Sequence, residues 1–152
     1  MTYETSEARG HLLDTVAEAI DEIGVALAVL GAAYEQLDDH NADRLEDELF
    51  RPVQTAYGRA QRTHAEFAGR HGLPTRTFAP ASAGVPSQGA KALLARAVEA
   101  VEEADLILTE LQDSMMPVEV GDAALRAGLA EVRGAVADLR ERARRLVSTL
   151  GR

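Results

Sequence analysis

The chain has 152 residues, a formal net charge of −9 and no cysteine. This length suffices to bury one core, so we expect a single domain over residues 1–152 without disulfides, thiolate metal ligands or a cysteine nucleophile. The acidic balance argues against nucleic-acid binding, because phosphates are neutralised by a basic face.

The first ten residues, MTYETSEARG, lack the basic and apolar regions of an export signal, so we expect a cytoplasmic protein. Thr5 or Ser6 can cap the first predicted helix. This helix includes an uncharged run from Ile23 to Tyr34, which is shorter than the roughly 17 to 25 residues of a membrane-spanning helix. We therefore expect no membrane contact. Its apolar residues alternate at steps of three and four, in a stripe formed by Leu13, Val16, Ile20, Ile23, Leu27, Leu30, Tyr34 and Leu37.

A second helix is predicted to begin near residues 41–43, after the break LDDHNAD, and to end at Gly72 and Pro74. Pro52 lies inside this helix. A proline ring clashes with the carbonyl four residues earlier, here that of Glu48, and removes one hydrogen bond. We therefore expect either a kink at Pro52 or a helix that begins late.

The segment GLPTRTFAPASAGVP is too rich in proline, glycine and small residues for regular structure. Ser87 can cap a third helix after it, and MMPVEVGD separates that helix from a fourth. Apolar stripes run from Leu94 to Met115 and from Leu125 to Leu150. The four amphipathic helices predict an all-α fold, an antiparallel up-down-up-down four-helix bundle with a longer loop between helices 2 and 3.

The charge alternates along the chain. Segments 1–48, 49–86, 87–122 and 123–152 have net charges of −11, +4, −6 and +4. In the up-down-up-down order the two acidic helices lie on a diagonal, so each has two basic neighbours. Arg126, Arg133 and Arg140 are placed to pair with those acids. The alternative is a solvated charged face whose individual pairs contribute little.

Val25 and Val29 of the first helix and Leu106 of the third are predicted to point away from the core. Together with Ala28 and Ala32, the two valines form an apolar patch. Such a patch is typical of an interface, although scattered apolar residues are also common on protein surfaces. We expect a homo-oligomer formed through the first helix, and an unidentified protein partner is the alternative occupant.

Four-helix bundles often hold two iron ions with Glu-x-x-His pairs, but this motif is absent from the sequence. In an antiparallel hairpin His11 comes level with His64 and His71, and Lys91 begins the third helix at the same end. These four residues form a candidate metal or anion site. The alternative is that bases at this end only complement the carboxyl ends of the second and fourth helices.

No residue pattern in the chain predicts catalysis, and none indicates a cofactor. The sequence thus favours a non-enzymatic helical bundle that acts through protein–protein contacts and self-associates. The second hypothesis is a bundle that binds a small anion or a metal at its histidine-rich and arginine-rich end.

Overall fold

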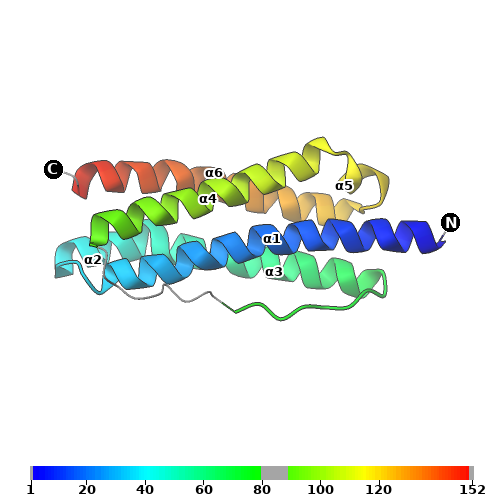
Figure 1. Ribbon diagram of the computed structural model, residues 1–152, viewed down its shortest axis with the longest axis horizontal. Coiled ribbons are helices and arrows are strands. Elements are labelled where there is room, and N and C mark those ends of the chain that lie inside the picture. Colours follow the sequence, from blue (N-terminus) through cyan, green and yellow to red (C-terminus); the bar gives the residue numbers. More distant parts are fainter. Residues whose placement is uncertain (1, 80–88, 151–152) are drawn as a thin grey trace.

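The computed structural model describes residues 2–79 and 89–150, and the regular elements in these ranges are all helices (Figure 1). They are α1 (Thr2–Tyr34), α2 (Asp39–Leu45), the π-helical turn η1 (Glu46–Phe50), α3 (Arg51–Arg70), α4 (Ala90–Asp113), α5 (Met116–Glu119) and α6 (Ala123–Leu150). No helix in this part of the chain is both long and apolar enough to cross a membrane. The predicted cap Ser87 lies outside the described residues, and Gly89 is the residue at the start of α4.

The four long helices are arranged up-down-down-up. Arg9, near the start of α1, donates from Nε to the carbonyl of Val120 at 2.9 Å, and Arg70 at the end of α3 pairs with Asp122 at 2.8 Å. The turn between α4 and α6 therefore lies at the end of the bundle where α1 begins and α3 ends. Consequently α3 and α4 run in the same direction, as Figure 1 shows, and the predicted up-down-up-down order is wrong for this pair.

The length of the connection between α3 and α4 makes this order possible. The 24 residues of α4 rise by about 36 Å. The nineteen residues from 71 to 89 could reach roughly 60 Å if extended, which is enough to return along the bundle. Around the bundle α1 packs against α4, α4 against α6, α6 against α3 and α3 against α1. Each neighbouring pair is therefore antiparallel, and α1 lies diagonally across from α6.

The core is aliphatic, and α1 contributes to it over a wide arc. Leu12, Ile20 and Ile23 are at most 1% exposed. Buried alanines recur in both α1 and α4, at positions 19, 26, 33 and 97, 100, 104. Small side chains let two helices approach closely, and α1 and α4 form the most extensive contact between any two elements of the described chain.

Val29 belongs to this buried arc. Its side chain is only 5% exposed, so the prediction that it points outward is wrong. The reason is that α1 contacts α3 as well as α4, and two neighbours bury a wider stripe than a single heptad row. Val25 is partly buried and packs against the core, whereas Leu106 is 50% exposed, as predicted.

Helical structure continues from Asp39 to Arg70 and accommodates Pro52 without a break. It begins where the Asp38 side chain accepts a hydrogen bond from the Asn41 amide at 2.8 Å. Directly before the proline, the chain widens into the π-helical turn η1. Pro52 has no amide hydrogen for the Glu48 carbonyl, and Arg142 of α6 donates to that carbonyl at 3.4 Å. A π turn thus occurs where a kink or a late helix start was expected, and the late start is wrong because helical structure already begins at Asp39.

Candidate functional site

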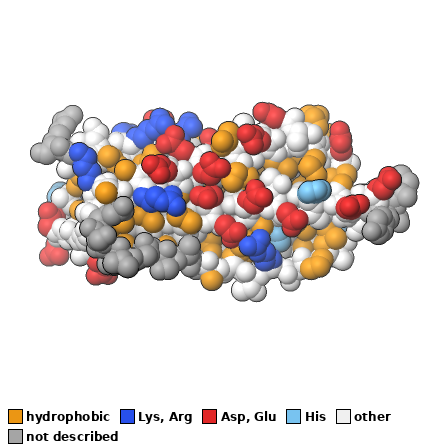
Figure 2. Space-filling model, viewed as in Figure 1, with side chains coloured by type: hydrophobic (Ala, Val, Ile, Leu, Met, Phe, Trp, Pro, Cys, Tyr) orange, Lys and Arg blue, Asp and Glu red, His pale blue; other side chains and the backbone are white. Residues whose placement is uncertain are grey.

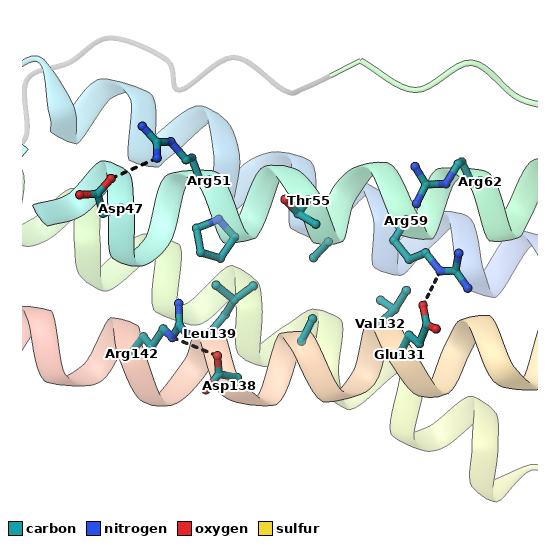
Figure 3. Close-up of a pocket in the computed structure, with 13 residues that line it drawn as sticks. Asp47, Arg51, Thr55, Arg59, Arg62, Glu131, Val132, Asp138, Leu139 and Arg142 are labelled. Atoms are coloured by element: carbon teal, nitrogen blue, oxygen red, sulfur yellow. Dashed lines mark ion pairs between the residues drawn. The ribbon is translucent and has the colours of Figure 1, made fainter. Parts of the chain in front are cut away.

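A groove with a volume of about 570 Å³ runs between α3 and α6 (Figure 3). Its floor is apolar and consists of Pro52, Ala56, Val132, Ala135 and Leu139. Its rim is charged, with Arg51, Arg59, Arg62 and Arg142 alongside Asp47, Glu131 and Asp138. An apolar floor with a few charged groups at its edge is typical of a binding site, and we call this feature the arginine groove.

The shape of the arginine groove follows from small residues on both helices. α3 and α6 are in close contact at Gly128. A Cβ added at this glycine would lie only 2.5 Å from Oγ1 of Thr63. Further along, Ala56 and Ala135 stand where larger side chains would fill the space between the helices. The helices are therefore held together at Gly128 and leave a hollow beside it.

Three ion pairs join arginines of the rim to carboxylates that also line the groove (Figure 3). Arg51 lies 3.4 Å from Asp47, and Arg142 lies 3.0 Å from Asp138. The pair between Arg59 and Glu131 crosses the groove with an Nε–Oε2 distance of 2.7 Å, although the N–H is not aimed at that oxygen. The carboxylates of these pairs are 58% to 65% exposed, so each pair contributes little to stability.

Arg62 differs from the other rim arginines. It is exposed, and it forms no ion pair or hydrogen bond with any residue in the described ranges. Its guanidinium group is therefore free to bind an anionic partner with up to five donors.

The observed helix order separates the charges across the molecule. α1 has six acidic residues and one basic residue, and α4 has six and two. α3 has one acidic and four basic residues, and α6 has three and six. Because the acidic helices are neighbours, they form one face, whose carboxylates are visible in Figure 2, and the basic helices form the opposite face. The predicted diagonal placement of the acidic helices is therefore wrong.

Arginines of α6 neutralise part of the acidic charge of α4. Arg140 pairs with Asp105 at 3.3 Å and Arg144 with Glu102 at 2.8 Å. Arg133 donates to Thr109 at 3.1 Å and also to Gln112. Arg126 binds the Pro117 carbonyl at 3.0 Å instead of an acid. Of the three arginines predicted to pair with acids, only Arg140 does so.

Four carboxylates on the outer side of α1 are not neutralised in this way. Glu4, Glu7, Asp14 and Glu18 are exposed and form no ion pair with any residue that the structure describes. Their spacing of three, seven and four residues places them on one face of the helix. We call these four residues the acidic row.

The four residues of the predicted metal or anion site do not form one cluster. His11 is exposed on α1, whereas His64 is 3% exposed and lies in the core-facing side of α3. His71 is partly buried, and its Nε2 lies 2.9 Å from Oδ2 of Asp122. Lys91 is at the opposite end of the bundle, because α4 begins there. No group of three or more histidine or carboxylate side chains within residues 2–79 and 89–150 is arranged to hold a metal ion.

Asp122 organises the end of the bundle where His71 lies. It accepts two hydrogen bonds from Arg70, at 2.8 and 2.9 Å, and one from the Leu125 amide at 2.8 Å. The hydrogen bond from Arg70 is the main reason why the pKa of Asp122 lies below its usual range, and those from Leu125 and His71 add to the effect. This arrangement fixes α3 to the start of α6, which is a structural role.

Comparisons with known proteins give no relative: no protein-family model, curated protein or solved structure matches the chain. An up-down-down-up order with one long crossover also occurs in ferritin-like bundles, but these project Glu-x-x-His pairs inward, and this chain has none. The site must therefore be interpreted from its own chemistry.

The arginine groove was not predicted from the sequence. Its four arginines belong to none of the predicted sites, because the expected topology placed the basic helices on a diagonal and not side by side. The signal that was present is the recurrence of Arg51, Arg59 and Arg62 on the outer side of a helix with a single acid, Glu66.

Proposed function

We propose that the protein is a non-enzymatic interaction module that self-associates, with the acidic row of one copy bound in the arginine groove of another. The separation of charge between the α1–α4 face and the α3–α6 face is the observation that carries this proposal. Because the two surfaces differ, the contact is heterologous: each copy offers a groove on one side and a row on the other.

The two surfaces also correspond in length. The acidic row extends over fourteen residue steps of α1, or about 21 Å. The arginines from Arg51 to Arg62 extend over eleven steps of α3, or about 16 Å, and Arg142 faces them from α6. Between the carboxylates lie Ala8, the exposed His11 and Thr15, so the row presents mainly polar groups to the charged rim of the groove.

This proposal moves the interface away from the patch predicted around Val25 and Val29. Val29 is buried within its own chain, and so it cannot centre a contact with a second copy. α1 keeps its predicted role in self-association, but charged residues of its first half replace apolar residues of its second half.

A pair of charge reversals tests the contact. Arg62→Glu should weaken binding by the arginine groove, and Glu18→Arg should weaken binding by the acidic row. Each variant alone should therefore self-associate with an affinity lower by about tenfold or more. An equimolar mixture should form a 1:1 dimer, because the intact row of the first variant meets the intact groove of the second. The measurement is light scattering at about 50 µM, a concentration at which micromolar affinities are visible.

Lys91→Glu is the matched control, since it makes the same charge change outside the groove and should leave association unchanged. Salt should weaken the association of the parent protein, because the contact is between exposed charges. A parent protein that stays monomeric at low salt, or a mixture of the two variants that fails to dimerise, would contradict the proposal.

A small anionic ligand is the second candidate for the groove, supported by its volume and by the unpaired Arg62. Phosphate or citrate would then raise the melting temperature of the monomer, and Arg62→Glu would abolish the effect.

A further inference from the structure

The residues that follow α3 form a strap, Leu73–Ala79, that lies against α1 and α3. The Leu73 amide donates to the carbonyl of Ala68 at 2.8 Å. Arg76 pairs with Asp21 of α1 at 3.0 Å, and its guanidinium carbon lies 5.0 Å from the centre of the Phe78 ring. Phe78 in turn meets the ring of His64 edge-to-face, with 5.3 Å between ring centres. The strap is thus held to the helices by one backbone hydrogen bond, one exposed ion pair, one aromatic contact and the partial burial of Leu73 and Phe78 against the core.

His64 is an unusual residue for this position. It is 3% exposed, and one ring nitrogen is hydrogen-bonded to the backbone of Leu13. The other nitrogen, Nδ1, is buried and has no hydrogen-bond partner within residues 2–79 and 89–150. Buried polar atoms in folded proteins are nearly always paired, so this nitrogen calls for an explanation.

We propose that His64 is an acid-sensitive latch, whose neutral imidazole holds the strap Leu73–Ala79 against α1 and α3 and whose protonation releases it. A neutral ring tolerates Nδ1 as an unpaired acceptor. A protonated ring carries a new N–H with no acceptor and a positive charge in an apolar site beneath Phe78, and both are costly. Displacing Phe78, whose ring lies against the imidazole and is the inner contact of the strap, would return water to the ring.

The charged groups around the ring favour this direction of response. Burial is the main cause that lowers the pKa of His64, and Arg76 of the strap lowers it further. The hydrogen bond to Leu13 and the charge of Asp14 on α1 act in the opposite direction, but they are the smaller influences. Asp21, the other carboxylate of α1 near the strap, is already paired with Arg76.

The sign of the pH dependence follows from the lowered pKa. A histidine whose pKa is lower in the closed state than its ordinary 6.5 binds fewer protons when closed than when released. Closure is therefore most favourable above about pH 6.5 and weakens as the pH falls below it. Leu73 and Phe78 are only partly buried, whereas the buried residues of the core all belong to helices, so the helices should remain folded in this range.

A single tryptophan can report on the latch, because the chain has none of its own. In the Phe78→Trp protein, the emission maximum should shift toward that of a solvent-exposed indole as the pH falls from about 8 to about 5. The far-UV circular dichroism should stay constant over the same range. Adding His64→Phe, which fills the site with an uncharged ring, should abolish the shift, and the control His11→Gln on the exposed histidine should leave it unchanged.

A second measurement uses the protein without any substitution at His64 or Phe78. Histidine titration by NMR should show one imidazole with a pKa below the ordinary 6.5, and the Phe78 ring signals should change with that titration. A constant emission maximum, a shift that persists with His64→Phe, or loss of helix in the same transition would overturn the proposal.

Discussion

Asp122 connects the end of α3 to the start of α6 with a single carboxylate. It caps α6 through the Leu125 amide, pairs with Arg70 at the end of α3 and contacts His71 beside it. The His71 ring also contacts the Phe67 ring in a tilted arrangement, with 4.5 Å between ring centres. From the sequence, His71 was a candidate ligand and Asp122 only part of a turn. Their pairing depends on which helix ends share one end of the bundle, and residue spacing does not reveal that.

We predict that Asp122→Ala destabilises the protein by about 1 to 3 kcal/mol, because the cap and the charged hydrogen bonds are lost together. Since the pKa of Asp122 is lowered by folding, its contribution is present above about pH 4 and is lost as the pH falls below that value. Urea denaturation at pH 7 and pH 3 should therefore show a smaller loss of stability on acidification for the variant than for the parent. Asp113→Ala, at an exposed position, should change stability by no more than about 0.5 kcal/mol, and an equal effect of both variants would refute the role of Asp122.

At the scale of the elements, the contact between α3 and α6 explains both the stability of that helix pair and the hollow beside it. Gly128 is buried, and its missing side chain leaves room for Thr63, which is 5% exposed. Gly134, one and a half turns further along α6, faces open space.

The apolar stripes of the helices and the distortion at Pro52 were predictable, because they depend on local periodicity and backbone chemistry. The buried position of Val29 was not, since it depends on how many neighbours α1 has.

The two glycines of α6 form a matched pair for mutation. Gly128→Ala should destabilise the protein by about 1 to 3 kcal/mol, because the new methyl group would overlap Thr63. Gly134→Ala should stabilise it by about 0.5 to 1 kcal/mol, as alanine is the better helix former. Thermal or urea denaturation separates the two. Thr63→Ala should partly rescue Gly128→Ala, and equal effects of the two glycine substitutions would show that the close contact is absent.

For the whole molecule, the direction of α4 determines how the acidic and basic helices are arranged around the bundle. With α3 and α4 parallel, the acidic helices become neighbours and the arginines of α3 and α6 line one groove. The alternation of charge along the chain was visible in the sequence, but its arrangement in space depends on the path of the α3–α4 connection. A long, proline-rich and glycine-rich connection permits either order, because neither composition nor hydrophobic spacing specifies its direction.

The direction of α4 is therefore the central claim, and one distance measurement tests it. Because the chain has no cysteine, spin labels can be attached to single cysteines at His11, Lys91 and Asp113, which are all exposed. The structure predicts a short His11–Asp113 distance and a His11–Lys91 distance longer by roughly 30 Å, close to the length of α4. Pulsed electron paramagnetic resonance on the two double-cysteine proteins measures both. A short His11–Lys91 distance with a long His11–Asp113 distance would restore the up-down-up-down order, and would contradict the separation of charge on which the proposed self-association rests.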